Sequence, residues 1–381
     1  MRSARMWTEK WLREFLNEAG VELNGPRPFD PQILDDRFYS KCYLAPSLKI
    51  GDAYMEGWWE CEQLDELFFR IFRHYNHKGI HGKGQQFLQW LWNTFVNLQT
   101  RVRSIQVAEM HYNLGNDLYA EMLGQTMAYT CGYWKHANTL EQSQYAKFDL
   151  VCRKINLKEG ENVLELGCGW GSFAKFAAEN YGCKVTGVNI SSEQVAYATK
   201  YCAGLHVKIH FCDYRDSEVY NKDKILFDKV VSIGLCEHIG PKNYRTFMEI
   251  VSQNIKQEGL FLLHTIGKNV STLAVDPWIH KYIFPNGMLP SIKFLAEAKE
   301  GLFVLEDLHN FGADYDKTLM AWHRNFVQNW PTLRSHYDER FYRMWTFYLL
   351  SCAGGFRARG MQLWQMVLSP KGVLGGYESI R

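Results

Sequence analysis

Hydrophobic residues follow two different patterns along this chain, one typical of helices and the other typical of strands. Before about residue 100 they recur every three or four positions, between loops that contain Gly and Pro. The clearest helical face comprises Phe87, Leu88, Leu91, Phe95, Leu98 and Val102. Further along, short apolar runs alternate with helix-sized segments, and these runs are 162–166, 184–190, 207–213, 227–234 and 259–267.

The five apolar runs predict a parallel sheet, because strands that alternate with helices form right-handed crossover units. Residues 302–308 and 361–369 can add two further strands, and 317–350 predicts a long amphipathic helical region. We therefore expect an α/β fold, with a Rossmann-like, mostly parallel seven-stranded sheet and a smaller, mainly helical N-terminal domain. The domains are placed at 1–104 and 105–381.

The composition is that of an ordinary globular protein. Of 381 residues, 46% are hydrophobic and 22% are charged, which excludes disordered, collagen-like and small disulfide-rich proteins. The ten cysteines show neither a CxxC pair nor zinc spacing, so we expect reduced thiols, no metal and a cytoplasmic protein. Charges interrupt the N-terminal segment, and no stretch approaches the ~18 apolar residues of a membrane span. The protein is expected to touch a membrane without crossing it.

The net charge of +2 hides two basic blocks. Residues 67–108 carry six basic and no acidic side chains, and residues 317–381 carry nine basic against three acidic ones. Basic and aromatic residues together are typical of a segment that lies on anionic lipid. The rings of the first block are Phe68, Phe69, Phe72, Tyr75, Phe87, Trp90, Trp92 and Phe95. The alternative is that these rings pack inside a helical domain. Arg357 and Arg359 are further candidates for head-group contacts, and no nucleic-acid partner is expected.

A glycine-rich turn after the first predicted strand is the strongest local motif. Residues 163–182 place Glu165 at the end of the strand and Gly167, Gly169 and Gly171 in the turn that opens the next helix. Glycine is needed where a Cβ would keep a ligand away from the backbone. The acid precedes the loop, and the dinucleotide spacing G-x-G-x-x-G is absent. This pattern favours S-adenosylmethionine, with its amino-acid end against the turn.

Polar residues after the second and third strands are candidates for the rest of that cofactor. Asn189, Ser191 and Gln194 can bind the ribose through neutral hydrogen bonds, and Asp213 and Tyr214 can flank the adenine. Asn189 and Ser191 are equally well explained as caps of the following helix.

Longer motifs make the chain similar to the cyclopropane-fatty-acyl-phospholipid synthases, which use S-adenosylmethionine to methylenate cis double bonds of membrane lipids. They are HYNLGNDLY, YTCGYW, LELGCGWG, CEHIGPKNY, LLHTIG, DPWIHKYIFPNG, HNFGADYDKTLMAW and FRARGMQLWQ. The likeness covers nearly the whole chain and implies the class I methyltransferase fold. The family pattern differs at Asn189, Ser172 and Cys236, which bears on detailed cofactor contacts and leaves the reaction class unchanged.

The resemblance also implies a second site. A bicarbonate ion would be held by Cys131, Glu237, His264, Tyr315 and the backbone of Ile266, and would act as the base. A carboxylate beside an anion is electrostatically unfavourable, so our own hypothesis is that Glu237 accepts the hydroxyl proton of bicarbonate or orients His264. We expect His238 to lie behind them. The cofactor site is extended to Tyr129, Thr130 and Gly234.

Each of these residues has a simpler explanation. Cys131 can be a small buried hydrophobe, His264 a core histidine and Tyr315 a packing residue. Cys352 is a candidate nucleophile, but packing is the preferred role because ring closure needs no thiolate.

Formation of a cyclopropane ring imposes two requirements on the site. Methyl transfer to an alkene makes a carbocation that must be kept from water, and a well-placed weak base then removes one proton. Relatives that share this cation could instead give a methyl-branched, methoxy or hydroxylated chain. A catalytically inactive lipid-binding protein is the third reading. A homodimer is expected from family likeness alone.

Overall fold

The computed structural model describes residues 2–42, 46–75 and 115–381, which form two compact units. The first unit contains the described residues up to 75 together with Leu273–Pro285 and Tyr315–Met361. The second contains 115–272, Asn286–Asp314 and Gln362–Arg381. The predicted helical face between Phe87 and Val102, most of the basic block 67–108 and the predicted boundary at residue 104 lie outside the described residues.

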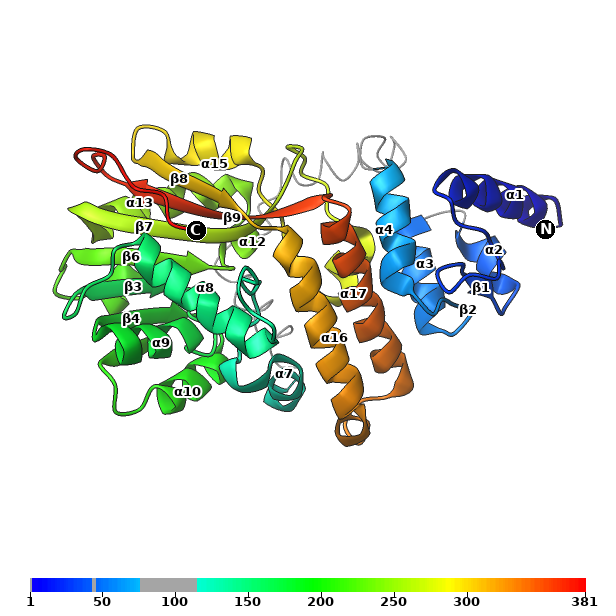
Figure 1. Ribbon diagram of the computed structural model, residues 1–381, viewed down its shortest axis with the longest axis horizontal. Coiled ribbons are helices and arrows are strands. Elements are labelled where there is room, and N and C mark those ends of the chain that lie inside the picture. The colour runs from blue at the N-terminus through cyan, green and yellow to red at the C-terminus, as the bar shows by residue number, and fades with distance from the viewer. Residues whose placement is uncertain (1, 43–45, 76–114) are drawn as a thin grey trace. The chain divides into compact units, whose positions relative to one another are not determined.

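A seven-stranded sheet forms the centre of the second unit, in the order β5-β4-β3-β6-β7-β9-β8 (Figure 1). The strands are β3 (Asn162–Leu166), β4 (Lys184–Asn189), β5 (Val207–Phe211), β6 (Phe227–Ile233), β7 (Ile255–Lys268), β8 (Val304–Asn310) and β9 (Met361–Ser369). The first five pair in parallel, and β8 runs antiparallel to β9. Each of the seven apolar runs is a strand, so the predicted fold class is confirmed.

Helices cover both faces of this sheet (Figure 1). One core cluster joins the sheet to α13 (Tyr244–Asn254) and α15 (Ile292–Lys299), and the other joins it to α8 (Leu140–Lys154) and α9 (Ser172–Tyr181). Neighbouring strand residues enter opposite clusters, as Val230 and Val231 do, because successive side chains of a strand point to opposite faces. Burial on both faces explains why these strands are continuous apolar runs.

Shorter elements complete the second unit. They are α7 (Asn116–Leu123), η1 (Gly124–Thr126), α10 (Ser192–Tyr201), α11 (Ser217–Tyr220), α12 (Cys236–Ile239) and η2 (Pro241–Asn243). The strand order reverses between β3 and β6, and in open α/β sheets ligands bind beyond the carboxyl ends of the strands at such a point.

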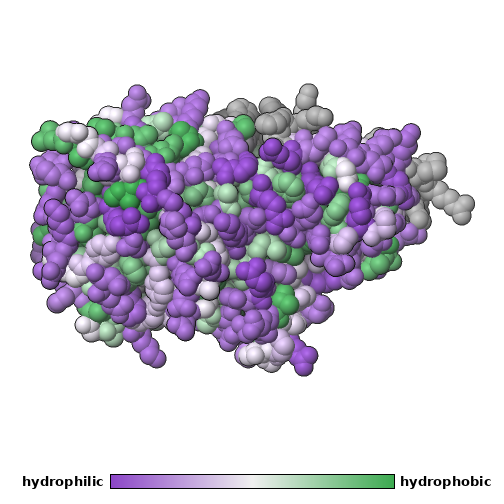
Figure 2. Space-filling model, viewed as in Figure 1, coloured by the Kyte–Doolittle hydropathy of each residue, from purple (hydrophilic) through white to green (hydrophobic). Residues whose placement is uncertain are grey.

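Strand β8 is the last in the sheet order, and its pairing register with β9 shifts between Leu305 and Asp307. Figure 2 shows apolar side chains gathered over β8 and the loop after β9, where Val304, Leu305, Leu308 and Leu374 are exposed.

The first unit is mainly helical. Its elements are α1 (Arg2–Glu18), β1 (Gln32–Ile33), α2 (Arg37–Cys42), α3 (Pro46–Met55), β2 (Trp59–Glu60), α4 (Leu64–Tyr75), α14 (Pro277–Tyr282), α17 (Glu339–Arg357) and most of α16 (Ala313–Leu333). Helix α17 packs against α3 and α4, and a Cβ on Gly354 would lie 2.7 Å from the backbone nitrogen of Phe69. Glycine therefore permits this close approach. The predicted domain 1–104 did not include these later segments.

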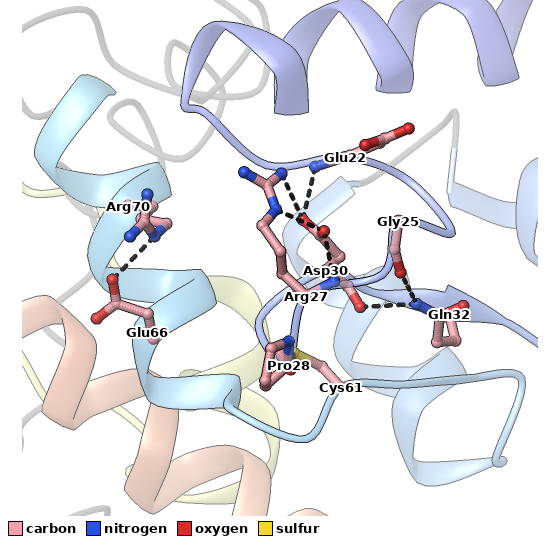
Figure 3. A network of polar contacts seen from close by, with 9 residues as sticks. All are labelled: Glu22, Gly25, Arg27, Pro28, Asp30, Gln32, Cys61, Glu66 and Arg70. Carbon is pink, nitrogen blue, oxygen red and sulfur yellow. Dashed lines mark hydrogen bonds and ion pairs between the residues drawn. The ribbon is translucent and has the colours of Figure 1, made fainter.

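The buried carboxylate of Asp30 organises the loop between α1 and β1 (Figure 3). It accepts hydrogen bonds from the backbone nitrogens of Glu22 (2.8 Å) and Arg27 (3.0 Å) and from the Arg27 guanidinium (2.7 and 2.9 Å). The Gln32 amide donates to the Gly25 carbonyl at 2.7 Å. The four bonds from Glu22 and Arg27 satisfy the Asp30 carboxylate, which would otherwise be costly to bury.

Several residues that were candidates for contact with lipid have partners inside the first unit. The Phe68 ring packs against Phe347 with centroids 5.3 Å apart, and Tyr75 is buried with its hydroxyl donating to the Phe15 carbonyl at 2.8 Å. Arg357 pairs with Asp65 at 2.7 Å and with Asp316 at 2.9 Å. For these side chains the structure favours packing and ion pairing over contact with a head group. No helix in the described ranges has the length and apolar character to span a bilayer.

Candidate active site

The glycine turn after β3 has the geometry that the sequence predicts. Gly167, Gly169 and Gly171 have φ of 80°, 53° and 82°, values that favour glycine. A Cβ on Gly167 would lie 2.9 Å from the Leu235 side chain, whereas a Cβ on Gly169 would meet no atom of the described residues within 4 Å. The turn is therefore held from one side and open above Gly169, where a ligand can approach the backbone.

Aromatic side chains connect the turn to α7. The Trp170 indole donates to Asn116 at 2.9 Å, and the Tyr119 ring contacts Trp170 and Tyr129 at centroid distances of 4.8 and 5.3 Å. Tyr129, a predicted cofactor residue, is thus placed beside the turn through two intermediate rings.

The predicted ribose residues form one hydrogen-bonded group with the turn. The Asn189 amide donates to the Gly169 carbonyl at 3.1 Å and to Gln194 Oε1 at 2.8 Å. Ser191 caps α10 by accepting from the Gln194 backbone nitrogen at 3.3 Å. The capping alternative thus holds for Ser191, while Asn189 braces the glycine turn.

Asp213 and Tyr214, the two predicted cofactor residues after β5, make different kinds of contact. Arg215 donates to both carboxylate oxygens of the buried Asp213 at 2.6 Å. The Tyr214 ring packs edge-on against Phe247 at 5.6 Å within the core. Tyr214 therefore serves packing here, and its predicted contact with adenine stays a prediction.

Glu237 lies in α12 just after β6, and His264 lies in β7 opposite Ile233, the last residue of β6. Glu237 Oε1 accepts from the Ile266 backbone nitrogen at 2.6 Å, and burial raises the Glu237 pKa to about 7 despite this bond. Among the described residues, no group bonds Glu237 Oε2. For the Ile266 backbone N–H to bind an anion, as predicted, its hydrogen bond to Glu237 would have to break.

His264 is almost fully buried and neutral. Gln365 Nε2 lies 3.3 Å from His264 Nδ1, a contact that suits a neutral ring with its proton on Nε2, and Nε2 has no partner in the described part of the chain. Burial lowers the His264 pKa well below its usual value, and the positive charges of Lys147 and Lys154 add to that effect. Gln365 is therefore the residue that orients His264. Glu237, for which that role was one of two expectations, bonds the Ile266 backbone nitrogen. Burial also lowers the pKa of His238, to about 4.

The segment before α8 carries Thr130 and Cys131. Cys131 is fully buried, with its sulfur 3.2 Å from the Gly132 carbonyl. A Cβ on Gly234, which follows β6, would lie 2.8 Å from the Thr130 methyl group. Thr130 thus reaches the same sheet edge as Glu237 and His264.

Lys147 and Gln144, which sequence reasoning missed, hold this segment. Both are fully buried on α8, where the Lys147 ammonium donates to Thr130 Oγ1 at 2.7 Å and to Gln144 Oε1 at 2.6 Å. Burial lowers the Lys147 pKa to about 7, and nearby Cys131 and Glu165 oppose that shift. Burial raises the pKa of Glu165. Lys147 stands out as a candidate only when its complete burial is known, and the sequence does not show that burial.

Tyr315 and Cys352 belong to the first unit. The Tyr315 ring packs against Phe356 at 4.4 Å, and its association with the residues of the second unit stays a prediction. Burial raises the Cys352 pKa to about 12, so the thiol is protonated at neutral pH and is a poor nucleophile.

A polar cavity of about 280 Å³ lies in the first unit. Its basic lining residues are Lys41, Lys49, Lys281 and Arg340, its acidic ones Asp52 and Glu56, and its rings Trp58 and Tyr282. Lys41 lies over the Trp58 ring at 4.9 Å.

Residues 99–366 match the family described as mycolic acid cyclopropane synthetase. The chain is 46% identical over 376 residues to a cyclopropane-fatty-acyl-phospholipid synthase of Escherichia coli, a match that covers 98% of this chain and 97% of the relative. It is 34% identical over 282 residues to a probable fatty acid methyltransferase of Pseudomonas putida, covering 71% of this chain and 70% of that one. The crystal structure of the mycolic acid cyclopropane synthase CmaA1 complexed with SAH and CTAB matches with a TM-score of 0.64 and 26% identity, over 70% of this chain and 98% of that one.

Proposed function

The chain belongs to the mycolic acid cyclopropane synthetase family, and on that premise we propose that it makes cyclopropane fatty acyl chains. It is an S-adenosylmethionine-dependent methyltransferase that acts on the cis double bond of unsaturated acyl chains in membrane phospholipids. The observation that carries this is the match to the Escherichia coli synthase, which spans 98% of this chain, whereas the mycolic acid enzyme covers 70%. The part of this chain that the mycolic acid enzyme does not match is thus largely matched by the phospholipid enzyme.

The glycine turn fits the methyl donor. The open space above Gly169 lets a ligand reach the backbone, and Asn189 fixes the turn from below. Ser191 and Gln194 can contact the ribose, and the Asp213–Arg215 pair lies after the neighbouring strand. Bound there, S-adenosylmethionine supplies an electrophilic methyl group.

The orphaned polar atoms fit a bicarbonate ion. His264 Nε2 is a donor and Glu237 Oε2 an acceptor, both buried and without partners among the described residues. Bicarbonate presents both acceptors and one hydroxyl donor, so each atom gains a partner of the right kind. When bound, bicarbonate supplies a weak base for the proton that leaves the methylated chain. Cys131 would add a thiol to its shell.

Rings near His264 suit a carbocation. The Phe311 ring lies 5.9 Å from the His264 ring and 5.3 Å from the Tyr133 ring. Aromatic faces stabilise a cation without forming a bond to it.

The polar cavity of the first unit suits a phospholipid head group. Its four basic and two acidic side chains give it an excess of positive charge, which favours a phosphodiester, and the acidic residues and rings favour an ammonium group. Peripheral contact with the inner face of the cell membrane would then be partly electrostatic. Binding to anionic vesicles should weaken as salt rises, and salt-independent binding would argue against this contact.

The experiment is to incubate the protein with S-adenosylmethionine and unsaturated phospholipid vesicles, with and without bicarbonate, and to characterise the fatty acids. A cyclopropane chain gains one CH₂, shows ring protons by NMR and contains no added oxygen. Glu237→Gln should reduce turnover about 100-fold or more while S-adenosylhomocysteine binding changes little. Unmodified fatty acids from the native protein would refute the proposed activity.

A second candidate product is a methyl-branched chain, which the likeness to a probable fatty acid methyltransferase supports. It shares the carbocation and differs in where the proton is lost. Absence of ring protons in a methylated product would identify it.

A further inference from the structure

Thr130 is held from behind by two buried side chains of α8. Lys147 Nζ lies 2.7 Å from the Thr130 hydroxyl oxygen, and the Gln144 amide donates to the Thr130 carbonyl at 2.8 Å. Gln144 is itself fixed, because its Oε1 accepts from Lys147 at 2.6 Å. Lys147 and Gln144 are both 0% exposed, so these bonds are shielded from bulk water.

This arrangement fixes the direction in which the Thr130 hydroxyl donates. An ammonium group has three donors and no acceptor, so the Thr130 oxygen must accept from Lys147. Gln144 Oε1 accepts from the same ammonium, and within the described residues both printed bonds between Thr130 and α8 have Thr130 as the acceptor. The hydroxyl proton of Thr130 is therefore available to an acceptor outside α8.

Thr130 lies beside the end of β6. It is partly exposed, and its methyl group lies 2.8 Å from the position that a Cβ on Gly234 would take, just beyond the end of β6. The sheet order reverses between β3 and β6. An outward hydroxyl donor at this point meets the ligand that occupies the crevice.

Lys147 can also supply positive charge beside Thr130. Burial has the larger effect and lowers the Lys147 pKa to about 7, whereas nearby Cys131 and Glu165 favour its charged form. A buried cation is stable only with anionic or hydrogen-bonding partners. A bound carboxylate that accepts from Thr130 would add such a partner.

We propose that Lys147, assisted by Gln144, is a positioning residue that turns the Thr130 hydroxyl into an obligate donor to the amino-acid carboxylate of S-adenosylmethionine. This inference rests on the proposed methyl-donor site. It assigns a role to two residues that lie behind that site and act through Thr130.

The test compares two ligands that differ only in the carboxylate. S-adenosylhomocysteine and its decarboxylated analogue are titrated calorimetrically into the native protein, Lys147→Met and Thr130→Val. A hydrogen bond to a charged group contributes enough for both variants to lose about 10- to 100-fold in affinity for S-adenosylhomocysteine. Affinity for the decarboxylated analogue should change less than about twofold by the same reasoning.

Lys154→Met is the matched control, because Lys154 is another fully buried lysine of α8 and pairs instead with Asp307. It should leave the ratio of the two affinities unchanged. Lys147→Arg keeps the charge and should restore part of the ratio. If Lys147→Met does not fold, Thr130→Val with the same two ligands gives the answer.

Equal weakening of both ligands by Lys147→Met would show a merely structural role and overturn the inference. A change in the bicarbonate requirement without a change in the affinity ratio would also overturn it, because the carboxylate would then not be the partner. Native protein that binds both ligands equally refutes the inference alone. Native protein that binds neither refutes the proposed function as well.

Discussion

Asp307 on β8 binds side chains of residues 379 and 381, and its replacement tests how much these contacts contribute to the stability of the fold. Arg381 donates to both Asp307 oxygens at 2.6 and 2.7 Å, Ser379 donates at 2.9 Å, and the buried Lys154 ammonium lies 3.5 Å away. Tyr377 donates to the Lys154 carbonyl at 2.8 Å. Removing the charge with Asp307→Asn would leave Lys154 buried without its anion.

The magnitude follows from two independent considerations. Burial alone would raise the Asp307 pKa, but hydrogen bonds from Arg381 and Ser379 hold it at about 2 against a usual 3.8. At 1.36 kcal/mol per pKa unit this difference corresponds to about 2 kcal/mol of folding stability. Removing one partner of a buried ion pair costs about 3–5 kcal/mol. We therefore expect Asp307→Asn to lower the free energy of unfolding by about 2–5 kcal/mol.

The assay is urea unfolding of the native protein and the variant between pH 3 and pH 7. Because the folded pKa is depressed, the contribution of Asp307 is complete above its unfolded pKa and is lost as pH falls from about 4 through about 2. The difference between the two proteins should be constant above pH 5 and shrink below pH 4. Glu179→Gln, which breaks an exposed pair with Lys175, is the control and should change stability by under about 1 kcal/mol.

A difference under about 1 kcal/mol at pH 7 would refute the reasoning, as would a difference that does not depend on pH. The double variant Lys154→Met with Asp307→Asn should recover part of the loss, because the stranded ammonium is then gone.

Three further predictions concern other parts of the protein. Cys352→Ala should keep turnover within about twofold, because the thiol is protonated; a loss above 100-fold would restore a catalytic role. Gln365→Leu should lower turnover about tenfold and shift the nitrogen-15 signals of His264 as its Nδ1 loses a donor; unchanged signals would contradict the assigned tautomer. Asp30→Asn should lower the unfolding free energy by about 1–3 kcal/mol in urea, and an unchanged midpoint would show that its hydrogen bonds contribute little.

The sheet and its glycine turn were predictable from sequence because their signals are local. Buried strands are continuous apolar runs, and Gly167 and Gly169 occupy backbone conformations that other residues rarely adopt. Glu237 and His264 were singled out because the ends of parallel strands meet at one sheet edge. Their motif predicts roles that a lone His or Glu would not suggest.

Other features depend on contacts between distant segments, which spacing does not encode. Lys147 lies in the sequence YAKFDL, where a lysine on an amphipathic helix ordinarily faces water. Its burial follows from Thr130, which precedes it by 17 positions. The grouping of 315–361 with the first unit depends on the packing of α17 against α3 and α4. Helical periodicity alone does not reveal that partner.

The register shift in β8 affects how the folded protein behaves at high concentration. A regular outer strand with exposed Val304, Leu305 and Leu308 would offer its backbone to a strand of another molecule. The irregularity between Leu305 and Asp307 interrupts the even spacing that such pairing needs. The protein can therefore keep apolar side chains on this strand with less risk of edge-to-edge aggregation.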